Sequence, residues 1–330
     1  MSRRPARLAL VSAVLMVAGC TGGGGAEPED SMAPKARAYL TSALDLMEKH
    51  SLMKAEVDWP KVRRDAFAHA AKARTPAETY GPIRQALRDL GDRHSTFLDP
   101  QDVARTQDAS ADGLMLPEGR RLPGGIGYLM LPPVASDEVA APYIRAARST
   151  VTGIDDEGAC GWVVDLRGES GGDMWPPLAA VGPILGDGEA GAAVYADGRK
   201  EAWAVQDGTP STYLDTWGAA TPLARPMPPV AVLTSRRTAS AGEAVVISFL
   251  GRPGTRTFGQ ATTGVPTANS AYRLSDGAMV VVTVAREADR TGLVHDGPLT
   301  PDVEIPETRG PDKALKAATA WLSGQEPCRS

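Results

Sequence analysis

The sequence predicts an α/β fold preceded by a small helical domain, and three observations support this. Apolar residues recur at helical spacing from residue 33 to about residue 90. Beyond residue 124 the chain contains short, nearly continuous apolar runs, which are typical of buried strands. Helical stretches alternate with these runs, as they do in α/β proteins. The predicted strands are 127–131, 161–166, 229–234 and 277–284, and the predicted helices among them are 138–151 and 239–250.

The same pattern predicts the limits of each part of the chain. Residues 33–100 are expected to form the helical N-terminal domain. The polar stretch 101–123 contains glycine, proline and charged residues, which indicate a linker loop. The α/β core is expected at 124–322, and a short tail at 323–330. The sequence shows no internal repeat.

The first twenty residues have the features of an export signal. Residues 1–7 contain three arginines and no acid, and the apolar run 8–17 that follows is too short to span a bilayer. The run leads into Val-Ala-Gly-Cys, a string that is similar to the bacterial lipobox, in which Cys20 becomes lipidated. An ordinary secretory signal that contains a cysteine is the alternative. Residues 21–32 are a glycine-rich tether. We therefore expect an exported lipoprotein of the cell envelope, held at a membrane through Cys20.

The composition argues against several classes of function. The formal net charge of −5 disfavours a nucleic-acid partner, because nucleic-acid binding usually requires a basic face. The sequence has no Cys/His cluster with metal-ligand spacing, so we expect no metal and no cofactor. The two other cysteines, Cys160 and Cys328, either pair in an oxidising compartment or remain as buried thiols.

Ser240 is a candidate nucleophile because it lies between a predicted buried strand and a predicted helix. At such a junction the hydroxyl points out of the sheet edge, beside the free backbone amides of the helix start. Those amides can stabilise negative charge that develops on a substrate carbonyl oxygen. A plain N-cap is the alternative, with Glu243 at the third helical position completing a capping box. The local string Thr-Ala-Ser-Ala-Gly-Glu, taken alone, favours the cap, so the role of nucleophile needs evidence from the rest of the sequence.

Five strings occur in an order that resembles the S41 peptidases, the family of tail-specific and C-terminal-processing proteases. In that family a strand end D-L-R-x-N-x-G-G is followed by T-A-S-A-x-E, G-x-x-T-x-G, L-x-D-G and a P-D-V segment. The corresponding stretches here are 165–172, 238–243, 259–264, 274–277 and 296–303. Each string alone is weak, but five in order are specific, and the resemblance covers about residues 40–305. It implies a ClpP/crotonase-like protease core and a serine peptidase that cleaves proteins or peptides through an acyl-enzyme on Ser240.

The resemblance also implies which residue is the general base. The processing branch of the family uses a lysine after the G-x-x-T-x-G string, but Val265 follows Gly264 here. The tricorn-like branch uses a histidine in an L-x-D-x-H-S/T string, and residues 90–95 match it, so His94 is implied. Histidine also titrates near neutrality, as a base for serine must. His295 is a rival base that matches no motif position.

The remaining site residues are implied by position in the family pattern. The tricorn-like branch has a glutamate ahead of the P-D-V segment, and Asp296 stands there, one methylene shorter. That branch also has a relay serine directly before the histidine, where this chain has Arg93, so a water or a threonine would have to substitute. The oxyanion hole is implied to use backbone amides of Ala241 and of Gly171 or Gly172. Residues 96–123 are too few for the PDZ domain that many processing proteases carry.

A binding module on the same fold is the alternative function. A decayed S41 site would hold a peptide or an apolar ligand without cleaving it. Asp296, Arg93 and Gln260, which replaces the usual glutamate, favour decay. Ser240, His94 and the intact glycine pair favour catalysis, so peptide-bond hydrolysis is the leading hypothesis.

Overall fold

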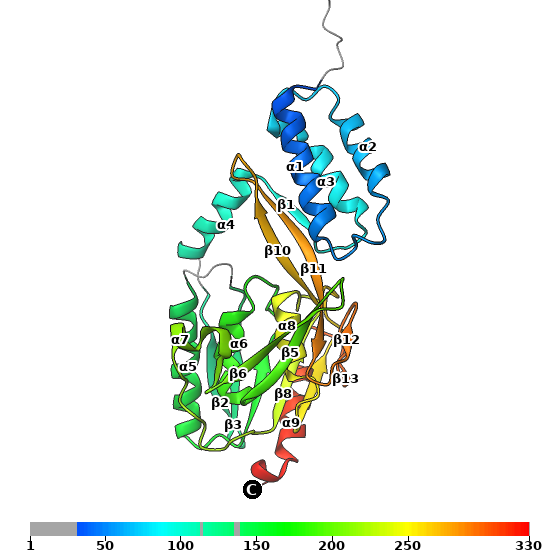
Figure 1. Ribbon diagram of the computed structural model, residues 1–330. Coiled ribbons are helices and arrows are strands. Elements are labelled where there is room, and N and C mark those ends of the chain that lie inside the picture. Colours follow the sequence, from blue (N-terminus) through cyan, green and yellow to red (C-terminus); the bar gives the residue numbers. More distant parts are fainter. Residues whose placement is uncertain (1–31, 113–114, 135–138, 330) are drawn as a thin grey trace, which may run out of the picture.

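A helical bundle sits at one end of an α/β core in the computed structural model, which describes residues 32–112, 115–134 and 139–329 (Figure 1). The bundle comprises α1 (Pro34–His50), α2 (Trp59–His69), the 3₁₀ turn η1 (Pro76–Thr79) and α3 (Tyr80–Asp89). Asp58 caps α2 by accepting the Lys61 amide at 3.0 Å, which explains where that helix begins. Strand β1 (Thr96–Leu98) and helix α4 (Pro100–Asp112) follow the bundle.

The core is a six-stranded sheet within the described residues, in the order β13-β9-β8-β4-β3-β2. All neighbours pair in parallel except β2, which is antiparallel to β3. The strands are β2 (Glu118–Leu122), β3 (Ile126–Met130), β4 (Gly161–Asp165), β8 (Val230–Thr234), β9 (Thr255–Gly259) and β13 (Val303–Glu304). The helices of the core are α5 (Ala140–Asp156), α6 (Trp175–Leu185), α7 (Leu214–Trp217), α8 (Ala241–Phe249) and α9 (Lys313–Ser323).

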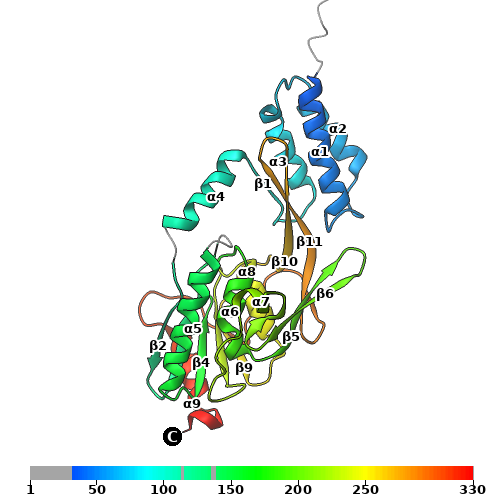
Figure 2. The ribbon, with the colours of Figure 1, turned by 60° about the vertical axis from the view of Figure 1, so that its left-hand side comes forward.

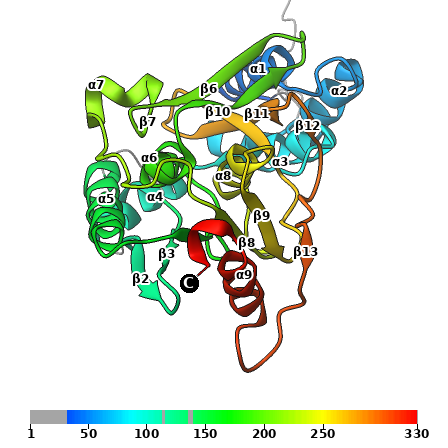
Figure 3. The ribbon, with the colours of Figure 1, turned by 90° about the horizontal axis from the view of Figure 1, so that it is seen from below.

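Helices cover both faces of this sheet. Side chains of α5, α6 and α8 form one apolar cluster with the sheet, and α9 packs against the opposite face. Figure 3, seen from below, shows α9 across the strands from α6 and α8. Trp162 is fully buried among them, and a Cβ on Gly127 would lie only 2.6 Å from its indole ring. Glycine at 127 therefore leaves the space that the indole fills. Every residue of α8 is buried, so this helix lies in the centre of the core.

The second sheet joins the core to the bundle. Within the described residues its order is β1-β11-β5-β6-β7, with β10 and β12 also paired to β11. The strands are β5 (Gly188–Tyr195), β6 (Lys200–Gln206), β7 (Thr209–Pro210), β10 (Thr267–Arg273), β11 (Met279–Asp289) and β12 (Val294–His295). Val280 and Val282 of β11 pack in the bundle, whereas Ala285 to Asp289 pair with β5. Figure 2 shows β10 and β11 rising from the core to the bundle.

Asp276 fixes the tip of this hairpin to the bundle. The hydroxyls of Tyr39 and Tyr80 donate to its two carboxylate oxygens at 2.8 and 2.5 Å. Partial burial opposes ionisation, but these two hydrogen bonds hold the pKa of Asp276 below its usual value. The aspartate of the L-x-D-G string is therefore a clamp between bundle and hairpin.

The predicted α/β class and the helical N-terminal region are confirmed, but the predicted loop at 101–123 is wrong. Helix α4 occupies much of it, with Asp99 accepting the amides of Gln101 and Asp102 at the helix start. Strand β2 occupies the rest. It is a polar edge strand paired only with β3, so it lacks the apolar pattern by which buried strands are recognised.

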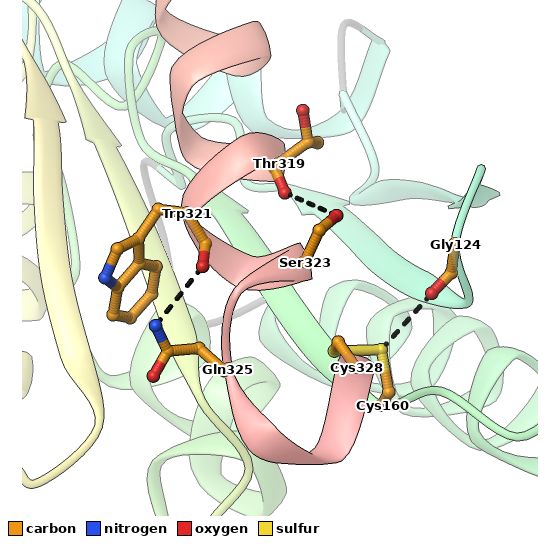
Figure 4. Close-up of a disulfide and its surroundings, with 7 residues drawn as sticks. All are labelled: Gly124, Cys160, Thr319, Trp321, Ser323, Gln325 and Cys328. Carbon is orange, nitrogen blue, oxygen red and sulfur yellow. Dashed lines mark hydrogen bonds between the residues drawn. A yellow bond between two sulfur atoms is a disulfide. The ribbon is translucent and has the colours of Figure 1, made fainter. Parts of the chain in front are cut away.

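A disulfide closes the side of the core at α9. Cys160, directly before β4, is bonded to Cys328 in the 3₁₀ turn Glu326–Cys328, and the two are 168 residues apart in sequence (Figure 4). Of the two possibilities left by the sequence, pairing is the one found. The Sγ of Cys160 also lies 3.4 Å from the Gly124 carbonyl oxygen, a contact without a donor hydrogen because a disulfide sulfur carries none. In the described part of the chain, no helix is long and apolar enough to cross a bilayer.

Removing the disulfide should destabilise the core without rearranging it. The bond closes a long loop, and losing such a bond typically costs about 2–5 kcal/mol. We expect the Cys160→Ser/Cys328→Ser double variant to unfold about 5–15 °C below the wild type. Thermal unfolding followed by circular dichroism measures this. Wild type under reducing conditions is the matched control and should reach the same value, and an unchanged melting temperature in both would contradict the prediction.

Candidate active site

Ser240 stands directly before α8, with a backbone conformation that an ordinary N-cap does not have. Its φ is +51° and its ψ −114°, whereas N-caps normally lie in the extended region. A positive φ is uncommon for a residue with a side chain and costs about 1–3 kcal/mol. Such strain is typical of a nucleophile held on a sharp turn between a strand and a helix. The side chain is half-buried.

Glu243 holds this strained turn in place. Its fully buried carboxylate accepts the Ser240 amide at 2.9 Å, as in a capping box. The same carboxylate accepts the amides of Gly264 and Val265, each at 2.9 Å, and the hydroxyl of Thr262. The capping interpretation is therefore right for Glu243. The glutamate additionally ties the start of α8 to the loop 262–265.

The glycine pair lies against Ser240, as an oxyanion hole would require. A Cβ on Gly171 would lie 3.2 Å from the Ser240 Cβ and 3.7 Å from its Oγ. Both glycines have a φ near +115°, at +119° and +114°, which other residues rarely adopt. The Gly171 amide donates to the Glu169 side chain at 3.3 Å. The amides of Gly172 and Ala241 donate to no other residue in the described part of the chain.

His94 lies in the short loop between α3 and β1, which Asp92 shapes. One oxygen of Asp92 accepts the amides of His94 and Ser95 at 3.0 and 2.6 Å, and its other oxygen accepts the Ser95 hydroxyl. Thr283 of β11 donates its hydroxyl to Asp92 and its amide to Ser95. This explains the D-x-H-S string: the aspartate and the serine hold the loop and anchor it to β11.

The His94 ring is paired with a threonine. Its Nδ1 lies 2.7 Å from Oγ1 of Thr267, at the start of β10. If Nδ1 carries the proton and donates it to Thr267, Nε2 is left as the basic nitrogen. Burial lowers the pKa of His94 below its usual 6.5, although the charge of Asp92 opposes this. The imidazole is therefore neutral, and able to act as a base, at neutral pH.

The two candidate catalytic residues, Ser240 and His94, are both tied to one short segment, 262–267. Glu243 binds the amides of Gly264 and Val265, and Arg93 donates to the Gly264 carbonyl at 3.1 Å. The hydroxyl of Thr267, three residues after Gly264, contacts Nδ1 of His94. In the described residues no hydrogen bond joins His94 directly to Ser240. In unliganded sites catalytic hydrogen bonds are often long or poorly aligned and form fully only when substrate is bound.

Asp296 is not where the family pattern led us to expect it. Its side chain is 74% exposed and forms an ion pair with Arg286 at 3.3 Å, and no hydrogen bond in the described residues links it to His94. The rival base His295 is bonded to Asp289 at 3.0 Å, on the far part of β11. The partner that the His94 ring has in the structure is Thr267. Nothing in the local sequence marks it, because 173 residues separate it from His94.

Two further buried acids were not predicted from the sequence as site residues. Glu169 and Glu287 each have one carboxylate oxygen without a partner in the described residues. Burial is the main reason that the pKa of each rises to about 8, and the charge of Glu243 adds to the effect in both cases. Groups with a shifted pKa are common at functional sites, and Glu169 contacts the glycine pair, so we include it in the candidate site. Cys20, the predicted lipidation site, lies outside the described residues.

The chain is similar to a nisin-resistance protein, to a lipoprotein and to a processing protease. Nisin-resistance protein of Lactococcus lactis subsp. lactis is 25% identical over 298 residues, covering 88% of this chain and 88% of that protein. The structure of a lipoprotein from Streptococcus agalactiae matches with a TM-score of 0.76 at 25% identity, covering 88% of this chain and 96% of that one. The photosystem II D1 C-terminal processing protease shares the fold with a TM-score of 0.62 at 17% identity, covering 90% and 99%.

The family assignment rests on the core that carries this site. The family model of Peptidase family S41 matches residues 125–305, which is more than half of the chain and includes the glycine pair, Ser240 and Thr267. By its core, its motifs and its fold, the chain belongs to peptidase family S41.

Proposed function

We propose that the chain is a serine peptidase of the cell envelope that hydrolyses peptide bonds of proteins or peptides through an acyl-enzyme on Ser240. The observation that carries this proposal is the strained backbone of Ser240, held by Glu243 against the glycine pair. An N-cap alone needs no such strain and no glycine pair beside it. The similarity to a nisin-resistance protein and to a streptococcal lipoprotein supports an envelope location.

The steps follow from the contacts of these residues. His94 Nε2 takes the Ser240 proton as Oγ attacks the substrate carbonyl carbon, while Thr267 holds the ring through Nδ1. The amides of Ala241 and Gly172 receive the carbonyl oxygen as it becomes negative. The imidazolium then protonates the leaving amine, and a water activated by His94 releases the acyl group from Ser240.

We also propose how the chain is divided into parts with separate roles. A signal peptide at 1–20 and a tether at 21–32 precede the bundle, which supplies His94, and the core supplies Ser240. A binding module with a decayed site remains the second candidate, because Asp296 does not contact His94. The first experiment separates the two.

Ser240 should react covalently with a fluorophosphonate probe, and the reaction should depend on His94. Burial lowers the pKa of His94, so the labelling rate should rise with pH through a midpoint below 6.5 and be level at pH 7. Labelling is followed by intact-protein mass spectrometry between pH 4.5 and 7.5. Ser240→Ala should abolish labelling and His94→Ala should reduce it at least 100-fold, about 3 kcal/mol in activation free energy. Wild type that is not labelled at any pH would support the binding module instead.

Thr267→Val should slow labelling by about tenfold to 100-fold. Valine keeps the shape and strand preference of threonine but leaves the buried Nδ1 without a partner, which costs about 1–3 kcal/mol. Thr267→Ser keeps the hydroxyl and is the matched control, with a rate close to that of wild type. Equal rates for the two variants would show that Thr267 has no part in the mechanism and would favour Asp296 as the partner of the histidine.

Cys20→Ser should release the protein from membranes without changing its fold. The prediction follows from the lipobox-like string alone. Fractionation of cells that produce the full chain should show wild type with the membranes and the variant in the soluble fraction. Thr21→Ser, one residue away, is the matched control and should stay with the membranes. A Cys20→Ser protein that partitions like wild type would contradict the lipid anchor.

A further inference from the structure

Glu169 lies between the glycine pair and the start of α8, and the proposed reaction gives it no role. Its side chain is fully buried. One carboxyl oxygen accepts the Gly171 amide at 3.3 Å, and the other has no partner in the described residues. Its main-chain carbonyl accepts the Ala239 amide at 3.1 Å, directly before the nucleophile. A Cβ on Gly242 would come within 2.3 Å of the Glu169 carboxyl, so the acid is packed against the first turn of α8.

The surroundings of Glu169 favour its neutral form. Burial raises its pKa to about 8, and the Gly171 amide opposes this only in part. The titratable groups whose charge interacts with it are Glu243 from α8, which raises the pKa further, and Tyr143 from α5, whose hydroxyl is bonded to the Pro132 carbonyl. At neutral pH the side chain is therefore mainly a carboxylic acid, with one accepting and one donating oxygen.

We propose that Glu169 is a positioning residue that must stay protonated: as a neutral acid it holds the Gly171–Gly172 turn against Ser240, and loss of its proton stops acylation. The proposal rests on the proposed function, because it concerns the same nucleophile. The family pattern has asparagine at this position. An amide and a protonated acid both offer an accepting oxygen, so Glu169, while neutral, accepts the Gly171 amide as an amide side chain would at any pH.

Loss of the proton to solvent changes the site in two ways. A carboxylate accepts an amide hydrogen bond about twice as strongly as a neutral group, so Gly171 is drawn further toward Glu169. The new negative charge also lies, buried and unscreened, beside the place where the substrate oxygen becomes negative. Both effects raise the barrier to acylation. The enzyme therefore has an alkaline limit that His94 does not set.

The test is the pH dependence of fluorophosphonate labelling between pH 6 and 10. Wild type should lose labelling rate above pH 8 by about tenfold per pH unit, as expected for loss of one proton. Glu169→Gln should label at pH 7 within about threefold of wild type and keep that rate to pH 10. Glu169→Ala should be slow at every pH. Glu287→Gln is the matched control, since it removes an equally buried acid that does not contact Gly171, and it should retain the alkaline loss.

The outcomes separate this inference from the proposed function. A wild type that is labelled equally at pH 7 and 10, or an alkaline loss that disappears in Glu287→Gln instead, would overturn the role of Glu169 and leave Ser240 as nucleophile. A wild type that is never labelled would remove the proposed function. In that case infrared difference spectra decide about the proton. At pH 6 the carbonyl band of a protonated carboxyl should be present in wild type and reduced in Glu169→Gln, and its absence from the difference would refute the neutral acid.

Discussion

The site depends on one buried carboxylate. Glu243 has no exposure to solvent, yet it accepts two hydrogen bonds from the loop amides at 264 and 265, one from a threonine hydroxyl and one from the Ser240 amide. A buried charge is tolerated only when donors of this kind surround it. Loss of any one donor would leave part of this buried charge unpaired, so the four hydrogen bonds are needed together. These hydrogen bonds join the strained Ser240 to the segment 262–267, whose last residue, Thr267, contacts His94. The strain at Ser240 and the position of Thr267 therefore both depend on Glu243.

The two halves of the site come from different parts of the chain. Ser240 stands at the start of a helix that is buried on all sides, whereas His94 follows the last helix of the bundle. The second sheet links the bundle to the core: Thr283 holds the His94 loop, Thr267 holds the ring, and both belong to the hairpin that reaches from core to bundle. The clamp at Asp276 fixes the far end of that hairpin. The position of His94 is therefore set by the packing of β10 and β11 and not by its own short loop.

The fold and the site were open to prediction to different degrees. Buried strands such as 161–166 and 229–234 were predictable because both faces are covered and the apolar runs are nearly continuous. Strand β2 was not, because a polar edge strand carries no such run. Ser240 and His94 are found through family strings. Glu169 stands in one of these strings, at the asparagine position, but Thr267 and Glu287 match no string. Their importance arises from burial and from contacts between distant residues, which no local pattern encodes. Asp296 shows the converse: it occupies the expected place in the string, yet its side chain points to Arg286 in solvent.

The long strand β11 has a consequence for the order in which the surroundings of His94 form. His94 is made early, but the residues that hold its loop and ring, Thr267 and Thr283, are made some 170 to 190 residues later. A chain that has been made only as far as the bundle therefore contains His94 without the residues that hold its loop and its ring. The contacts of His94 with Thr267 and of its loop with Thr283 form only after the hairpin has been made and has folded back onto the bundle. Under the proposed function, a chain built in this order has no supported base until nearly all of the core is present.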